Sequence, residues 1–287
     1  MYGRIININE TLKEVCKAIA SAETITREHI KLYYHDANEE FITFALYCHI
    51  QQKLGEASRG KRIEKAFVED LKAAFRNRRI FINWELQRKL NERAMGLVAD
   101  IVLHNRRQEG KTGGDFGLIV VRPQIIGDND STDIKRGHSS GLLCQAKLRN
   151  EKGKWGSFTD NQKEVLPECL DYTSLVLYSF VDNARSELNP LAWKLCKGNS
   201  FSEVEKLLNK SKVDGTRDTA DIVKRLGRSE IGTDNQALID KYISPSSQHH
   251  LEIRIDWPED SEPKKPTEIK IQHKQKTQST VHIRLRH

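Results

Sequence analysis

The sequence predicts an α/β protein in which a mixed central sheet is flanked by helices. Apolar residues recur at helical spacing in the first part of the chain, and short apolar runs with strand character follow. The chain has 287 residues, of which 37% are hydrophobic, so it can bury a sizeable core. We therefore expect one α/β core with additional helical elements at its N-terminal and C-terminal ends.

The helices are predicted from apolar residues that recur every three or four positions. Leu12, Val15 and Ile19 give this pattern near the N-terminus, and Gly55 and Gly60 mark a break between two later helices. The expected helices cover residues 10–22, 38–54, about 61–77, about 159–171 and most of 190–243.

The strands are predicted from short apolar runs bounded by turn-forming residues. Leu251, Ile253 and Ile255 alternate with polar residues, as in a strand with one buried face. The stretch 122–140 is expected to be an irregular excursion between two strands. The expected strands cover residues 80–86, 97–103, 116–121, 142–148, 174–181, 249–257 and 281–285.

These elements predict four segments along the chain. Residues 1–55 form an N-terminal helical segment, and residues 56–185 form the α/β core. Residues 186–257 add a helical extension and a strand. Residues 258–287 form a basic tail that begins with a polar, proline-bearing linker.

The positive charge of the chain is concentrated in the tail. The net charge is +7, and residues 264–287 carry seven Lys or Arg and one acid, a net of +6. A second basic stretch, residues 59–79, has eight Lys or Arg and three acids. Such stretches favour a polyanionic partner such as nucleic acid, although a solvated surface has the same composition.

Several classes of protein are disfavoured by what the sequence lacks. The five cysteines are scattered without a CxxC pair, which argues against a zinc site or a disulfide framework. No apolar run approaches the roughly 18 residues of a membrane span, and the first ten residues are polar. We therefore expect a cytoplasmic protein without a membrane partner. Neither a GxxxxGK[ST] loop nor a GxSxG elbow is present.

The most informative polar residues accompany two of the expected strands. Asp115 follows two glycines at the start of the run 116–121, and Gln145 and Lys147 lie in the run 142–148. Successive strand residues point to opposite faces, so Gln145 and Lys147 share one face and Ala146 points away. Three simpler interpretations stay open: Asp115 as a turn cap, Gln145 as a polar-face residue, and Lys147 as an exposed strand residue.

This pattern resembles the PD-(D/E)xK nuclease superfamily, in particular its Mrr-like branch, in which Gln often replaces the first acid of the (D/E)xK motif. The resemblance covers residues 56–181 and rests on the glycine-led Asp115, the strand with Gln145 and Lys147, and the flanking helices. It implies a restriction-endonuclease-like core.

The resemblance also implies a metal-dependent phosphodiesterase site. Mg²⁺ or Mn²⁺ would be held by Asp115, the Gln145 amide oxygen and the Ala146 carbonyl, and Lys147 would orient the attacking water or offset phosphate charge. Because Gln145 is neutral, we expect a further acid to contribute. Glu64 shares an apolar helical stripe with Val68, Leu71 and Phe75, so it is our first choice. Glu56 and Glu85 are the alternatives.

The expected activity is therefore endonucleolytic cleavage of nucleic acid, with double-stranded DNA as the substrate and restriction or anti-phage defence as the setting. The alternative is a non-catalytic nucleic-acid-binding or protein-interaction module that retains the nuclease fold. The resemblance also allows a homodimer or larger homo-oligomer. The expected phosphate contacts are Arg59, Lys61, Arg62, Arg78 and Arg79.

Overall fold

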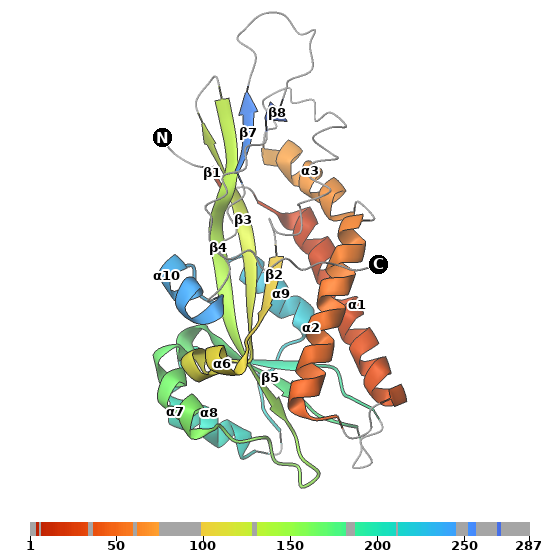
Figure 1. Ribbon diagram of the computed structural model, residues 1–287, viewed down its shortest axis with the longest axis vertical. Helices are drawn as coiled ribbons and strands as arrows, with labels where there is room; N and C mark the ends of the chain where they lie inside the picture. Colours follow the sequence, from red (N-terminus) through yellow and green to blue (C-terminus); the bar gives the residue numbers. More distant parts are fainter. Residues whose placement is uncertain are drawn as a thin grey trace, which may run out of the picture.

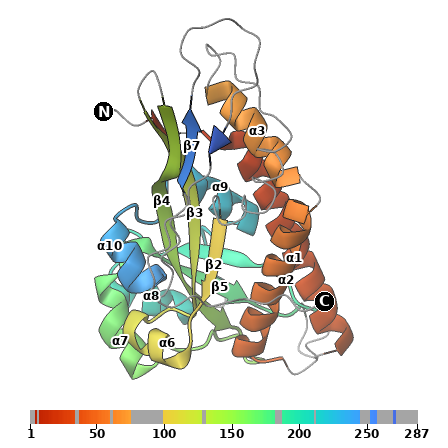
Figure 2. The same cartoon turned by 45° about the horizontal axis from the view of Figure 1, so that its top comes forward.

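The protein has an α/β fold in which one mixed sheet lies between two sets of helices (Figures 1 and 2). Among the described residues, no helix is both long and apolar enough to span a membrane. The computed structural model describes residues 4–5, 7–33, 37–59, 62–74, 99–127, 131–181, 187–210, 212–244, 252–256 and 269–270.

A long antiparallel hairpin of β3 (Phe116–Gly127) and β4 (Ser131–Leu148) forms the centre of the sheet. Its register runs from Phe116 opposite Cys144 to Gly127 opposite Thr132, with one bulge between Arg122 and Gln124. The prediction of an irregular excursion over 122–140 was therefore wrong, because both strands continue through it. The strands are β1 (Arg4–Ile5), β2 (Ala99–Leu103), β3 (Phe116–Gly127), β4 (Ser131–Leu148), β5 (Thr173–Tyr178), β6 (Ala192–Leu195), β7 (Glu252–Asp256) and β8 (Ile269–Lys270).

The two ends of this hairpin have different neighbours. Around the start of β3 and the end of β4, the strand order is β2-β3-β4-β5-β6, and only the β4–β5 pair is parallel. Around the hairpin tip, β1 pairs with β3, β7 pairs with β4, and β8 pairs with β7. The start of β3 and the end of β4 thus lie in a five-stranded mixed sheet. Asp115, Gln145 and Lys147 lie at this end of the hairpin.

Most of the expected helices are present. The predictions over 10–22 and 38–54 are confirmed, and both helices are longer than expected. The helix expected over 159–171 breaks into short 3-10 turns. Pro167, which lacks an N–H, lies near the start of the first of these turns, Leu166–Glu168. The helices are α1 (Asn9–Tyr33), α2 (Glu39–Arg59), α3 (Arg62–Ala74), α6 (Arg106–Thr112), α7 (Asp160–Val165), η1 (Leu166–Glu168), η2 (Leu170–Tyr172), α8 (Phe201–Leu208), α9 (Thr219–Gly227), α10 (Gln236–Leu238) and η3 (Ile239–Ile243).

Two hydrophobic clusters cover the two faces of the sheet. On one face, residues of α1, α2, α3 and α9 pack against Phe116, Leu118 and Val120 of β3. On the other face, residues of α8, η1, η2 and η3 pack against Ile119 and Val121. Alternate β3 residues thus enter opposite clusters, as strand geometry requires.

The remaining predictions concern segment boundaries and individual strands. Helix α2 runs across the predicted boundary at residues 55 and 56. The prediction that 190–243 is mostly helical missed β6, which pairs with β5. The strand expected over 249–257 is confirmed as β7, and part of the basic tail forms β8. The strands expected over 80–86 and 281–285 lie outside the described residues.

Candidate active site at the end of β4

Asp115 is positioned by a tight turn between α6 and β3. Gly113 ends α6 with a left-handed φ of 73°, a conformation that side-chain-bearing residues rarely adopt. A Cβ on Gly114 would lie 2.4 Å from a side-chain carbon of Leu143, so only glycine fits against β4 there. Both glycines are therefore needed to deliver Asp115 to the sheet, as the sequence predicts.

His104 supports the same turn from the end of β2. Its Nδ1 lies 2.9 Å from the Gly114 carbonyl oxygen and 3.0 Å from Thr112 Oγ1, and its Nε2 lies 3.1 Å from the Ile243 carbonyl oxygen. Burial lowers the pKa of His104, which favours the neutral imidazole. His104 thus links the turn before Asp115 to the end of η3.

Asp115 is held by hydrogen bonds from β4. Its Oδ2 accepts from Gln145 Nε2 at 2.6 Å and from the Ala146 backbone N–H at 2.5 Å. Gln145 Nε2 also lies 3.1 Å from the Ala146 carbonyl oxygen. The amide nitrogen of Gln145 therefore lies near two oxygens, of Asp115 and Ala146, that the family resemblance implies as metal ligands.

Lys147 follows on the same face of β4. Its Nζ lies 5.0 Å from the centre of the Phe158 ring, which packs in the same cluster as Leu143, whereas Ala146 packs in the opposite cluster. The predicted alternation of these side chains is confirmed. Lys147 is only 3% exposed, so its interpretation as an ordinary solvent-facing strand residue was wrong.

The acid that meets Lys147 is Glu39, at the start of α2. Glu39 Oε1 lies 3.9 Å from Lys147 Nζ, and Glu39 Oε2 accepts a hydrogen bond from the Leu148 backbone N–H at 2.7 Å. Asn38 accepts a 2.8 Å hydrogen bond from the Phe41 N–H and caps the helix. The helix start is thereby fixed beside the end of β4.

Burial and like charge raise the pKa values of both carboxyl groups. The pKa of Asp115 rises from its ordinary 3.8 to about 7, mainly because burial penalises the charged form. The Ala146 N–H and Lys147 act in the opposite direction, and Glu39 and Glu109 raise the pKa further. The pKa of Glu39 is raised by burial and lowered by Lys147. Burial therefore disfavours the charged forms of both carboxyl groups, and a bound cation would stabilise those charged forms.

The donor atoms at this site suit a hard divalent cation. Among the described residues, Gln145 Oε1 is a buried acceptor without a hydrogen-bond partner. The Ala146 carbonyl and the Asp115 and Glu39 carboxylates supply further oxygens, the ligand type that Mg²⁺ prefers. No cluster of three or more His, Cys, Asp or Glu capable of holding a metal occurs in the described part of the chain. Mg²⁺ sites in proteins commonly use one or two carboxylates and complete the coordination with waters, so Asp115 and Glu39 with the amide and carbonyl oxygens are a suitable donor set.

Glu64 does not belong to this group of residues. It lies on α3, which begins after the far end of α2 and packs on α1. The 21 residues of α2 span about 30 Å, so the backbone of α3 is remote from Glu39. The prediction that Glu64 joins Asp115, Gln145 and Lys147 was therefore wrong, and the acid that lies beside Lys147 is Glu39. Glu56 lies seventeen residues along α2 from Glu39 and pairs with Lys53 at 2.6 Å, and Glu85 is outside the described residues.

The predicted phosphate contacts are only partly described. Arg62 is exposed on the first turn of α3, and Arg59 is the last residue of α2. Lys61, Arg78 and Arg79 lie outside the described residues. Phosphate contact by these five residues therefore stays a prediction.

Sequence reasoning missed two residues that the structure brings to the site, Glu39 and His104. The helix start at Glu39 was visible in the sequence, because an Asn followed by two acids is typical of a helix N-terminus. No pattern in the nearby sequence indicates that Glu39 lies beside Lys147. Comparison of the chain with protein-family models, with curated proteins and with solved structures gave no match.

Proposed function

We propose that this protein is a metal-dependent nuclease with a restriction-endonuclease-like core. The observation that carries the proposal is the convergence of Asp115, Gln145, Lys147 and Glu39 at the end of β4. There Glu39 pairs with the buried Lys147, Asp115 accepts a hydrogen bond from Gln145, and Gln145 Oε1 has no hydrogen-bond partner among the described residues. The order of elements around them supports it, because α6, β3, β4, α7 and β5 surround the motif with strands and helices.

Each residue has a role that follows from its position. Asp115, Gln145 Oε1 and the Ala146 carbonyl would hold Mg²⁺ or Mn²⁺, and Glu39 would supply the second negative charge. Such an ion lowers the pKa of a bound water and stabilises the charge of the phosphate. Lys147 carries its ammonium group to the same place, where it orients the water or offsets phosphate charge. Phe158 and Glu39 restrict the movement of Lys147.

The proposal is tested by incubating the purified protein with supercoiled plasmid, linear duplex, single-stranded DNA and RNA. Each substrate is assayed with Mg²⁺, with Mn²⁺ and with EDTA. We expect cleavage with either metal and none with EDTA. Absence of cleavage in the Lys147→Met variant would assign the activity to this site and exclude a contaminating nuclease.

A second candidate is a nucleic-acid-binding module that retains this fold without cleaving. The neutral Gln145 favours it, because its amide nitrogen already satisfies Asp115 without a metal. In that case, all four substrates stay intact with either metal, while duplex DNA still binds with a salt-dependent affinity.

A further inference from the structure

The polar face of β4 continues one step beyond Lys147, at Arg149. The Arg149 backbone N–H donates to the Tyr178 carbonyl oxygen at 2.8 Å, so the pairing with β5 extends past the end of β4. Strand residues two apart share a face, so Arg149 lies on the face of Lys147, about 6.8 Å farther along the strand. Leu148, between them, packs in the opposite cluster. Arg149 therefore lies in line with the candidate active site.

The chain turns back directly after Arg149 in a tight hairpin. Asn150 donates its N–H to the Lys154 carbonyl oxygen at 2.7 Å, and Gly153 donates its N–H to the Asn150 carbonyl oxygen at 2.9 Å. Gly153 makes the turn with a left-handed φ of 76°, which a residue with a side chain rarely adopts. These bonds give the turn a defined conformation. We call residues 149–155 the basic hairpin.

The returning strand of the basic hairpin passes beside the candidate active site. The Gly156 N–H donates to the Leu148 carbonyl oxygen at 2.9 Å. A Cβ on Gly156 would lie 3.5 Å from Glu39 Oε2 and 3.8 Å from Lys147 Cδ, which are ordinary contact distances. The basic hairpin is therefore attached at both of its ends to the end of β4 that carries Lys147.

The guanidinium group of Arg149 is held in place without an acid. Its Nε donates to the Gly153 carbonyl oxygen at 3.0 Å, and its central carbon lies 5.9 Å from the centre of the Trp155 ring. In the described part of the chain, no carboxylate forms an ion pair with Arg149. The two contacts restrict the side chain but leave its charge uncompensated. A half-buried arginine in this state suits a phosphate group, to which a guanidinium can donate two parallel hydrogen bonds.

The tip of the basic hairpin adds further positive charge. Lys152 and Lys154 are exposed, and neither has an ion-pair partner among the residues that the structure describes. The basic hairpin contains three basic residues and one acid, Glu151. An exposed surface with this charge, next to a site for phosphodiester chemistry, favours contact with a nucleic acid backbone.

We propose that the basic hairpin contacts the backbone of a nucleic acid strand, with Arg149 on the phosphate next to the one at Lys147. This inference rests on the proposed function, because it takes the position of the substrate from Lys147. Arg149 would hold its phosphate by charge-assisted hydrogen bonds, and Lys152 and Lys154 would add contacts farther along the backbone. Phosphate contacts fix the register of a bound nucleic acid, so Arg149 acts as a positioning residue.

The test measures binding separately from cleavage. The full chain is titrated into a short fluorescein-labelled duplex in EDTA, and the anisotropy is followed at several NaCl concentrations. Arg149→Gln should raise Kd about tenfold and reduce the log–log salt slope by about 0.9. Arg149→Lys retains the charge and should keep the slope, but it should recover only part of the affinity because lysine lacks the planar fork of donors.

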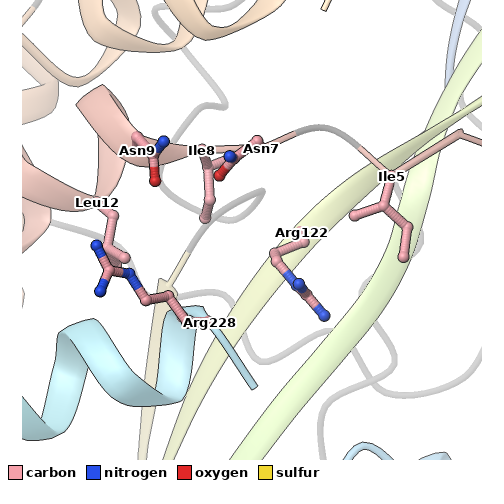
Figure 3. Close-up of a pocket in the computed structure, with 8 residues that line it drawn as sticks. Ile5, Asn7, Ile8, Asn9, Leu12, Arg122 and Arg228 are labelled. Carbon is pink, nitrogen blue, oxygen red and sulfur yellow. The ribbon is translucent and has the colours of Figure 1, made fainter. Parts of the chain in front are cut away.

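Arg228→Gln is the matched control. Arg228 ends α9 beside a cavity of about 530 Å³, where its side chain and that of Arg122 point apart (Figure 3). Its ion pair with Glu230 is long, at 3.9 Å, so the variant also removes weakly compensated positive charge. Arg122 lies opposite His138 of β4, eleven residues before Arg149 and about 36 Å from it along a strand. The control should change neither Kd nor the salt slope.

The outcomes separate this inference from the nuclease activity. An unchanged salt slope in folded Arg149→Gln, or an equal reduction in Arg228→Gln, overturns the inference even if the wild type cleaves. A wild type that does not cleave, together with a flatter slope in Arg149→Gln, overturns the nuclease and retains the phosphate contact. If Arg149→Gln does not fold, the double variant Lys152→Gln and Lys154→Gln decides, because both side chains are exposed. Its slope should fall, and an unchanged slope would refute contact by the basic hairpin.

Where the wild type cleaves, steady-state kinetics test the positioning role. Arg149→Gln should raise KM for the duplex about tenfold and lower kcat much less, because Arg149 does not touch the reacting atoms. A loss confined to kcat would contradict this role.

Discussion

Gln145 Nε2 lies 2.6 Å from Asp115 Oδ2 and directs its amide nitrogen, not its oxygen, to the carboxylate. The amide N–H group thus lies beside Asp115, and the amide oxygen has no hydrogen-bond partner among the described residues. A half-turn of the amide would exchange the two atoms and present Oε1 to a cation. This relationship makes Gln145 the residue whose substitution reports most directly on metal binding.

Gln145→Glu should weaken the metal-free protein and strengthen its response to Mg²⁺. A second carboxylate next to Asp115 adds like charge in a buried place, so Tm without metal should fall. The Mg²⁺ concentration that gives half of the thermal stabilisation should fall about tenfold, because ligand binding stabilises the folded state by mass action. Gln162→Glu makes the same charge change in the capping box of α7 and should alter neither quantity. An unchanged Mg²⁺ dependence would exclude Gln145 from the metal site.

Lys147→Met should abolish most of the cleavage and leave metal binding in place. Methionine keeps much of the aliphatic stem in the buried position of Lys147 but removes the ammonium group, so we expect a loss of about 10² to 10³-fold. Lys147→Arg retains the charge and should recover part of the rate. The measurements are the rate at saturating substrate and the Mg²⁺-induced shift in Tm. A Lys147→Met protein that cleaves at the normal rate would rule out this active site.

Glu39→Gln and Glu64→Gln form a pair that tests the corrected acid. Glu39 lies 3.9 Å from Lys147 and raises the pKa of Asp115, so its neutralisation should reduce both the cleavage rate and the Mg²⁺-induced thermal shift. Glu64 lies on α3, remote from the site, so its neutralisation should leave both unchanged. The reverse pattern would restore Glu64 as the acid.

Asp115→Asn should flatten the dependence of stability on pH. The pKa of Asp115 is about 7 in the folded protein against an ordinary 3.8, so the folded state retains a proton that the unfolded chain releases. Stability from this group is therefore present below pH 3.8 and is lost as the pH rises to about 7. Denaturant unfolding at pH 5 and pH 8 should show a smaller loss in Asp115→Asn than in the wild type. Equal losses would show that Asp115 is not the titrating group.

The basic tail should add electrostatic affinity for nucleic acid without taking part in the chemistry. Complete removal of residues 264–287 would also remove β8, which pairs with β7, and would lower Tm. Replacing Lys264, Lys265, Lys274 and Lys276 by Gln keeps β8 and removes four charges. Each lost phosphate contact should reduce the log–log salt slope on duplex DNA by about 0.9. An unchanged slope would show that these lysines do not contact nucleic acid.

The faces of β4 were predictable because they depend on local geometry. Strand alternation alone places Gln145 and Lys147 on one face and Ala146 on the other, and the glycines before Asp115 indicate a tight approach. The length of the β3–β4 hairpin was not predictable in the same way. Residues 122–140 contain proline, glycines and many polar residues, so their strand conformation depends on pairing between the two strands, with β1 and β7 on either side.

The sequence by itself determined an α/β protein, the presence of helices α1 and α2, the strand segments 116–121 and 142–148, and the turn that carries Asp115 to the sheet. Only the tertiary structure decided which acid meets Lys147 and how Asp115 is charged. Glu39 and Leu148 are 109 residues apart in the chain, and their contact depends on how α2 packs along the sheet. Periodicity reveals which face of a helix is buried, but the end-to-end placement of that helix depends on packing with residues far away in the sequence.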